Sequence, residues 1–341
     1  MKNVIIQSKK KDFGDISFFL KENFGFLEIG EDRNMVGFLS KWRRILMIFS
    51  DAIFVIKKRA ELSGSNLLFS SGFISFFIRL FIKFGLIQCN TFIWIGLLIH
   101  SERSFKIHKV LLKLTKIKDE KFTVSSKCEI DLYSKKLGIP KSCFIYIPLG
   151  DYIEREFTQV ETEVDGEYYF AGGYSNRNYA PLINVFRKLP QKLVIVGSHL
   201  NEELNLNDVP ENIIIYQDID KNLFEILVRN SKACILPLKK DTGASGQRVI
   251  NSYLRNGKTV IAKDMCMTRE YFSHSVNGFL YKHTEPELLS LINTIENNPD
   301  LLVKTNRNTV DFYNSELTKK ALFHHYDHLV KKYSKAYKTE A

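Results

Sequence analysis

The stretch CILPLKKDTGASGQRVINSYLRNGKTVIA, residues 234–262, decides the fold of this chain. Its apolar start, 234–236, predicts a buried strand, and the polar segment 241–247 predicts a loop. A helix is then indicated by apolar residues that return on one helical face: Val249, Ile250, Tyr253 and Leu254. Gly257 ends this helix, and 259–262 predicts a second buried strand. We therefore expect a strand, a glycine-rich loop, a helix and a strand in succession.

The loop and the start of the predicted helix favour an anionic ligand. The first turn of a helix leaves backbone N–H groups unpaired, and the helix dipole places partial positive charge there. Gly243 and Gly246 let a bulky group approach the backbone closely, and Ser245 is placed to cap the helix. We expect a phosphate or pyrophosphate at this point. A plain strand-to-helix turn is the alternative, because a glycine loop alone is a weak signal.

Length and charge divide the chain into two different halves. Its 341 residues are enough for two domains. Residues 1–150 contain 25 lysines and arginines against 13 aspartates and glutamates, an excess of +12, whereas the whole chain carries +11. The basic first half indicates an anionic partner such as a membrane surface, or a basic surface kept for solubility. We do not expect nucleic acid, because the basic residues lack an aromatic-interleaved or finger-like pattern.

In the first half, two predicted strands end in polar residues. The strand at 3–7 is followed by Asp15, and the strand at 91–98 is followed by His100 and Glu102. Ligands of open α/β sheets gather beyond the carboxyl ends of the strands. These three side chains are therefore candidate catalytic bases.

The segment 72–84, GFISFFIRLFIKF, is the most apolar helix candidate. Arg79 and Lys83 interrupt the apolar run, so we do not expect a membrane span. Two interpretations stay open: a core helix packed on the sheet or, together with Arg43 and Arg44, a helix on a bilayer surface. The N-terminus lacks a signal-peptide pattern, which favours a cytoplasmic location.

The second half begins after an acidic segment, 151–167, which predicts a linker. Residues 168–171 then open a second series of strands and helices, and 317–337 predicts one long final helix. We expect no metal or other cofactor, because we identify neither an Asp-x-Asp cluster at the end of a strand nor His/Cys ligand spacing.

Several of these segments resemble the GT-B glycosyltransferases of the family 4 type. The segment 124–153, VSSKCEIDLYSKKLGIPKSCFIYIPLGDYI, is similar to the helix and proline-glycine exit that end their first domain. The segment 170–186, FAGGYSNRNYAPLINVF, is similar to the opening of their second domain. The helix, strand and donor loop of that domain resemble three further segments: NLFEILVRNSKACILPL (222–238), ASGQRVINSYLRNGKTVIA (244–262) and NGFLY (277–281).

The resemblance implies an α/β chain of GT-B architecture, in which two Rossmann-like domains face each other across a cleft and a C-terminal helix crosses back. It implies an acceptor-binding domain at 1–155 and a nucleotide-sugar-binding domain at 156–316. The helix at 317–341 would pack on the N-terminal domain.

The donor site of the family corresponds to the two glycine loops of the second half. The implied donor-binding residues are Gly172, Gly173, Arg177, Asp241, Thr242, Ser245, Gly246, Gln247 and Arg248. Glycosyl transfer requires stabilisation of the leaving diphosphate, and we expect Arg177 to supply the cation, with Lys239 and Lys240 in reserve. The acceptor base would come from Asp15, His100 or Glu102.

The sequence departs from the family at two positions. Many members carry two glutamates eight residues apart around the donor loop, and these positions are Ala244 and Ser252 here. In the family the second glutamate holds the donor ribose. For this chain the resemblance therefore implies neither this ribose contact nor retention of the stereochemistry at the transferred sugar.

The resemblance implies a metal-independent, hexosyl-type glycosyltransferase. Its donor would be a nucleotide-diphosphate sugar, by default a UDP-sugar, and its acceptor a saccharide or lipid-linked saccharide in surface polysaccharide or glycoconjugate synthesis. The basic first domain would dock on the anionic inner face of the membrane. Two alternatives are a catalytically silent GT-B subunit that supports a partner glycosyltransferase, and a sugar-nucleotide epimerase on the same fold.

Overall fold

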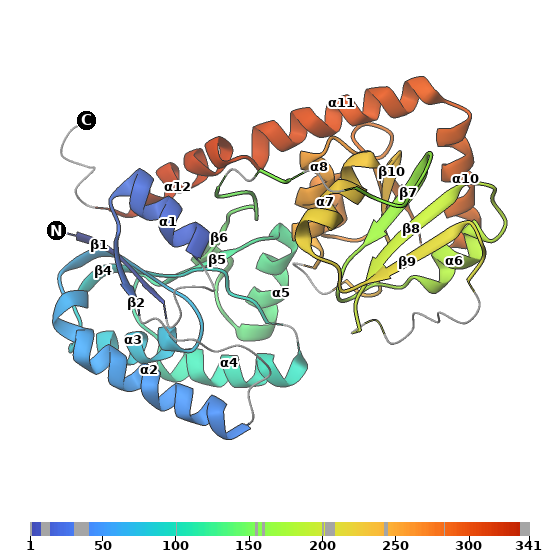
Figure 1. The fold of residues 1–341 in the computed structure, drawn as a ribbon. Coiled ribbons are helices and arrows are strands. Elements are labelled where there is room, and N and C mark those ends of the chain that lie inside the picture. The colour runs from blue at the N-terminus through green and yellow to red at the C-terminus, as the bar shows by residue number, and fades with distance from the viewer. Residues whose placement is uncertain are drawn as a thin grey trace. The chain divides into compact units, whose positions relative to one another are not determined.

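The computed structural model describes residues 2–7, 14–30, 41–99, 101–153, 156–158, 161–199, 201, 209–241, 245–282 and 284–334. For residues 7, 14, 15, 41–45 and 47 it describes the backbone alone. The chain divides into two compact units, each built on its own parallel sheet (Figure 1). Unit 1 comprises Met1–Pro148 and the chain from Leu322 onward, and unit 2 comprises Leu149–Ala321.

Unit 1 contains a six-stranded parallel sheet in the order β2-β1-β3-β4-β5-β6. Its strands are β1 (Lys2–Gln7), β2 (Leu27–Gly30), β3 (Ser65–Ser70), β4 (Cys89–Trp94), β5 (Lys121–Val124) and β6 (Phe144–Tyr146). Its helices are α1 (Gly14–Phe24), α2 (Lys41–Leu62), α3 (Ile74–Lys83), α4 (Glu102–Leu114), α5 (Lys127–Leu137) and α12 (Lys319–Tyr333), which enters the unit at Leu322. Every residue of β3 is buried, as is typical of a parallel strand covered by helices.

Helix α3 belongs to the core of unit 1, so the alternative of a helix lying on a bilayer is wrong for this segment. Phe76 is buried in the apolar core, and the Arg79 side chain is fully buried. Arg79 Nη2 lies 2.7 Å from Glu120 Oε2 and donates to Leu112 O at 3.1 Å, and Arg79 Nε donates to Thr115 Oγ1 at 3.1 Å. Burial lowers the pKa of Arg79 to about 10, against the opposing influence of Glu120. This arginine is an internal anchor and is not available to a lipid headgroup.

The predicted final helix, 317–337, corresponds to α12 (Lys319–Tyr333), whereas the helix that precedes it was not predicted. Helix α11 (Pro299–Glu316) ends at Leu317, and α12 begins at Lys319. Thr318 separates them, because its Oγ1 accepts a hydrogen bond from Ala321 N at 3.3 Å, as an N-terminal cap does. Within unit 1, the rings of Phe24 and Phe323 stack at a centroid distance of 5.1 Å, which joins α12 to α1.

Unit 2 contains a second six-stranded parallel sheet in the order β12-β11-β10-β7-β8-β9. Its strands are β7 (Tyr168–Gly172), β8 (Lys192–Gly197), β9 (Ile213–Gln217), β10 (Ala233–Leu236), β11 (Val260–Lys263) and β12 (Phe279–Tyr281). Its helices are α6 (Ala180–Phe186), α7 (Lys221–Asn230), α8 (Gln247–Arg255), α9 (Thr268–Tyr271), α10 (Glu285–Glu296) and α11. The strand, loop, helix and strand predicted for 234–262 are confirmed as β10, α8 and β11 with their connections.

The strand order of unit 2 reverses at its centre. The chain proceeds from β7 through β8 to β9 on one side, and then from β10 through β11 to β12 on the other. Strands β7 and β10 are hydrogen-bonded neighbours. Ligands of open α/β sheets bind beyond the carboxyl ends of the strands at such a reversal, so this edge is the place to search for a site.

Within the described residues, no helix is both long and apolar enough to cross a membrane.

Candidate functional site

Two loops meet at the centre of unit 2, where the strand order reverses. The first follows β7 and contains Gly173 and Arg177, and the second follows β10 and leads into α8. An isolated bridge between Arg177 and Leu238 joins the loops, and Asn178 N donates to Pro237 O at 2.8 Å. The fold therefore brings together the two glycine loops predicted from the sequence, which lie 60 to 70 residues apart in the chain.

The side chain of Arg177 turns back into the space between these loops and is 6% exposed. Its Nε donates to Gly172 O at 3.1 Å, and its Nη1 donates to Ser175 O at 2.8 Å. These bonds hold the guanidinium in one orientation, with Nη2 beside Gly246.

This guanidinium is a buried cation without an acidic partner. Among the described residues no carboxylate forms an ion pair with it, and its nearest titratable neighbours are two neutral phenols, Tyr179 and Tyr253. Burial lowers the pKa of Arg177, because desolvation disfavours the charged form. A desolvated charge with no counter-ion is costly, and the cost is relieved when an anion binds. A buried guanidinium beside the start of a helix is an arrangement that can bind an anion.

Two glycines make room for the guanidinium. A Cβ at Gly173 would lie 2.4 Å from Arg177 Nη2, and one at Gly246 would lie 3.3 Å from the same atom. Both glycines also have positive φ, +140° and +86°, which other residues rarely adopt. Gly173 and Gly246 are thus required by the position of Arg177 as well as by the turns themselves.

Asn176 fastens the two loops to each other. Its Nδ2 donates to Lys240 O at 2.8 Å and to Ser245 Oγ at 2.9 Å, and its Oδ1 accepts from Lys240 N at 3.0 Å. Its φ of 55° lies in the left-handed region, which asparagine tolerates better than most residues. Sequence reasoning missed Asn176, because the partners of an asparagine in a loop cannot be recognised from its neighbours in the chain.

The start of α8 differs from the prediction in one detail. Gly246, in the left-handed conformation, is the capping residue, and among the described residues no side chain caps the helix. The Oγ of Ser245 instead accepts a hydrogen bond from Asn176. The helix dipole places partial positive charge at this first turn, beside Arg177.

Two buried tyrosines, Tyr179 and Tyr253, hold the backbone of the first glycine loop. Tyr253 Oη accepts from Gly172 N at 2.8 Å, and Tyr179 Oη donates to Gly173 O at 3.0 Å. The helical spacing predicted Tyr253 as a core residue, which is correct for its ring. The role of its hydroxyl was not predicted, since that role depends on the neighbouring strand.

The other predicted donor-binding residues lie around this centre. Gln247 is buried at the start of α8, whereas Arg248, Lys239 and Lys240 are exposed. Asp241 is exposed and its Oδ2 accepts from Cys266 N at 3.0 Å. Thr242 lies outside the described residues.

The predicted acceptor bases belong to unit 1. Glu102 lies in the first turn of α4, is exposed and pairs with Lys136. Asp15 lies in the first turn of α1, where the side chain is not described, and His100 lies outside the described residues.

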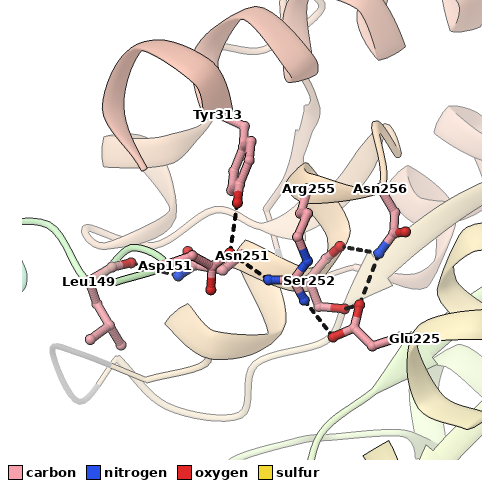
Figure 2. Close-up of polar contacts among 8 residues, drawn as sticks. All are labelled: Leu149, Asp151, Glu225, Asn251, Ser252, Arg255, Asn256 and Tyr313. Carbon is pink, nitrogen blue, oxygen red and sulfur yellow. Dashed lines mark hydrogen bonds and ion pairs between the residues drawn. The ribbon is translucent and has the colours of Figure 1, made fainter. Parts of the chain in front are cut away.

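Ser252, the position at which the resemblance implies a ribose-binding glutamate, is buried within unit 2 (Figure 2). Its Oγ donates to Glu225 Oε2 at 3.0 Å, and Glu225 on α7 is itself buried. Arg255 Nη2 donates to Glu225 Oε1 at 2.6 Å, and Asn256 Nδ2 donates to Oε2 at 3.0 Å. Both carboxylate oxygens of Glu225 therefore accept hydrogen bonds within unit 2, so Glu225 does not replace the glutamate that the resemblance implies.

The described residues contain no group of three or more His, Cys, Asp or Glu side chains that could hold a metal ion. The expectation that no Asp-x-Asp cluster follows a strand is wrong, because Asp218 and Asp220 come directly after β9. Asp220 accepts from Asn222 N and Leu223 N as the cap of α7, and Asp218 Oδ2 lies 3.1 Å from His199 Nδ1.

Replacing Asn176 by glycine is expected to weaken nucleotide binding about tenfold. The glycine keeps the positive φ but removes three hydrogen bonds between the loops, each worth about 1 kcal/mol. Titration calorimetry with a nucleoside diphosphate measures the change. Asn308→Gly on α11 is the matched control, and equal affinity in both variants would show that the link between the loops is unimportant.

Comparisons with known proteins show which sequences and folds this chain is similar to. Residues 167–311 match the family model of the glycosyl transferases group 1. A search of curated protein sequences finds no match. Among solved structures, a glycosyltransferase from Rickettsia africae superposes with a TM-score of 0.69 at 14% identity, covering 98% of this chain and 99% of its own.

Two further structures have the same fold. HepE from Anabaena, solved with UDP, superposes with a TM-score of 0.71 at 12% identity, covering 97% of this chain and 100% of its own. Sucrose-phosphate synthase from Thermosynechococcus elongatus superposes with a TM-score of 0.70 at 12% identity, covering 97% and 99%. The predicted GT-B fold is confirmed by these superpositions, and residues 167–311 are similar to the glycosyl transferases group 1.

Proposed function

We propose that this chain transfers a hexosyl group from a nucleotide-diphosphate sugar, with UDP as the nucleotide, to a saccharide or lipid-linked saccharide. One observation carries the proposal: the Arg177 guanidinium is buried at the strand reversal of unit 2, and none of the described carboxylates pairs with it. A diphosphate is the anion that such a cation and a helix start recognise together. HepE, one of the structural neighbours, was solved with UDP and with UDP-glucose.

In this proposal the chain's own residues stabilise the leaving diphosphate. Arg177 donates to its oxygens through Nη2, and the first turn of α8, from Gly246 to Arg248, adds backbone N–H groups and the helix dipole. Lys239 and Lys240 lie exposed on the second loop and strengthen the positive field. Asp241 and Thr242 contact the sugar hydroxyls. With these cations in place the reaction proceeds without a metal ion.

The acceptor is bound by unit 1, and the base comes from Asp15, His100 or Glu102. The excess of +12 in residues 1–150 supports a peripheral position on the anionic cytoplasmic face of the membrane. This position suits a lipid-linked acceptor in surface polysaccharide synthesis.

A silent subunit that supports a partner glycosyltransferase is the second candidate. It is favoured by Ser252, which occupies a glutamate position and faces inward onto Glu225.

Thermal stabilisation across UDP, GDP, TDP, CMP and their common sugar conjugates tests the proposal. A ligand that binds only the folded state at 100 times its Kd stabilises by about 2.7 kcal/mol, which is a clear shift in Tm. Stabilisation by UDP and one UDP-sugar, followed by turnover of that sugar, is the expected result. Stabilisation without turnover favours the silent subunit, and no stabilisation by any nucleotide contradicts the donor site.

A further inference from the structure

Helix α2 is apolar on two opposite faces. One face packs in the core of unit 1 through Phe54, Val55 and Leu62, which are buried. The other face carries an exposed stripe at positions i, i+3, i+7 and i+10, formed by Leu46, Phe49, Ile53 and Ile56. A helix that only covers a sheet needs the first face alone, so the second requires another explanation.

Helix α4 has the same double character. Phe105 and Leu112 are buried against the core, whereas Ile107, Val110 and Leu114 form an exposed stripe at i, i+3 and i+7. The seven side chains of the two stripes are between 45% and 66% exposed. Single exposed hydrophobic residues are ordinary, but two stripes with helical spacing in one unit are not.

Both stripes lie on the same side of the unit 1 sheet. Helix α3 lies next to α2, and its C-terminal half reaches α4, where Arg79 donates to Leu112 O and Lys83 donates to Leu114 O. Figure 1 shows α2, α3 and α4 together below this sheet. The buried faces of α2 and α4 pack toward the sheet. Their exposed stripes therefore both point away from it. We call this surface the α2–α4 face.

The α2–α4 face is basic around its apolar stripes. Helix α4 exposes four basic residues, Arg103, Lys106, Lys109 and Lys113, and its only acidic residue, Glu102, pairs with Lys136. Helix α2 adds Lys57 and Arg59, which are exposed. Aliphatic and aromatic side chains between lysines and arginines are the composition of helices that lie in the headgroup region of an anionic bilayer.

We infer that the α2–α4 face is a docking surface for an anionic lipid bilayer. The apolar stripes enter the boundary between headgroups and acyl chains, and the lysines and arginine of α4 contact lipid phosphates. The inference rests on the peripheral position proposed above and gives it a location, in place of the buried helix α3. A symmetric contact between two copies of this chain is disfavoured, because it would bring the same basic residues against each other.

Vesicle co-sedimentation of the full chain tests the inference, with neutral phosphatidylcholine vesicles and with vesicles that contain phosphatidylglycerol. Two double variants remove one stripe each: Phe49→Glu with Ile53→Glu, and Val110→Glu with Leu114→Glu. The matched control, Val303→Glu with Val310→Glu, places the same charges on exposed valines of α11 in unit 2. A third variant, Lys106→Glu with Lys109→Glu and Lys113→Glu, reverses the charge of α4.

We expect the wild type and the control to bind the anionic vesicles, and each stripe variant to bind about tenfold less. The charge variant is expected to lose its preference for anionic over neutral vesicles, and salt is expected to weaken wild-type binding. Nucleotide-induced stabilisation, which reports on unit 2, is expected to stay unchanged in every variant. Failure of the proposed donor site and failure of this surface are therefore distinguishable.

Equal binding of the wild type, both stripe variants and the control would overturn the inference. It would also be overturned if sedimentation velocity showed a wild-type dimer that both stripe variants dissociate, with no difference in vesicle binding. In that case the α2–α4 face would be a contact between copies of this chain.

Discussion

The Arg177→Ala variant is expected to transfer sugar at least about a hundredfold more slowly than the wild type. In the proposed mechanism the guanidinium faces the charge that develops on the leaving diphosphate, and removing one preorganised donor of this kind typically costs about 10²–10³ in kcat. Its burial strengthens the effect, since water does not screen a 6% exposed side chain. The rate at saturating donor and acceptor measures the loss, and donor-induced stabilisation measures the accompanying loss of binding.

Two further variants separate charge from geometry at the same place. Arg177→Lys keeps the charge, but one ammonium group cannot reproduce the bonds to Gly172 O and Ser175 O, so we expect most of the loss to persist. Gly173→Ala keeps Arg177 itself but places a Cβ 2.4 Å from its Nη2, which displaces the guanidinium. The control is Arg307→Ala, which removes an exposed arginine of α11. Wild-type transfer by a folded Arg177→Ala protein would refute the assignment.

The Glu225→Ala variant is expected to lose about 3 kcal/mol of the free energy of unfolding, because it breaks a buried ion pair and leaves several buried donors without their acceptor. The carboxylate is almost inaccessible and receives bonds from Ser252, Arg255 and Asn256 (Figure 2). Arg255 also pairs with Asp151, which accepts from Tyr313 Oη at 2.7 Å. Without Glu225, the donors of α8 and its C-terminal cap lose their common acceptor.

Urea unfolding followed by circular dichroism measures this loss. Lys188→Ala serves as the control, because it breaks the more exposed and longer Lys188–Glu285 pair at 3.8 Å and is expected to cost at most about 0.5 kcal/mol. Glu225→Gln keeps the shape of the side chain, and its loss of stability is expected to lie between those of Glu225→Ala and Lys188→Ala. A Glu225→Ala protein as stable as the control variant would show that the buried network contributes no net stability.

Local patterns predicted the secondary structure of the donor segment correctly, for a physical reason. Glycine is needed where φ is positive, as at Gly246 and Gly257, and the helical repeat from Val249 to Leu254 follows from burial of one face of α8. Both requirements act within a few residues. The same reasoning placed the two glycine loops at the carboxyl ends of strands, and unit 2 brings these strands side by side.

Local patterns did not predict the burial of a side chain where that burial depends on a partner distant in the sequence. Arg79 was a candidate for a lipid contact, but its partner Glu120 lies 41 positions away and draws it into the core of unit 1. The periodicity of α3 did not reveal this, because an arginine inside an apolar run is compatible with a surface helix or a core helix. The exposed stripes of α2 and α4 were not predicted either, because apolar spacing does not show which of two apolar faces packs on the sheet.

By itself, then, the sequence determined two α/β halves, the order of the donor segment and the presence of an arginine after a glycine turn. These properties depend on backbone conformations and side-chain periodicity that are local. Only the tertiary structure decided that Arg177 is buried, with no carboxylate partner in the part of the chain that the structure describes. It also decided that Ser252 faces Glu225 and that α2 and α4 expose their second apolar faces. Each of these depends on which elements become neighbours in the fold, and a parallel sheet makes neighbours of segments that are far apart in the chain.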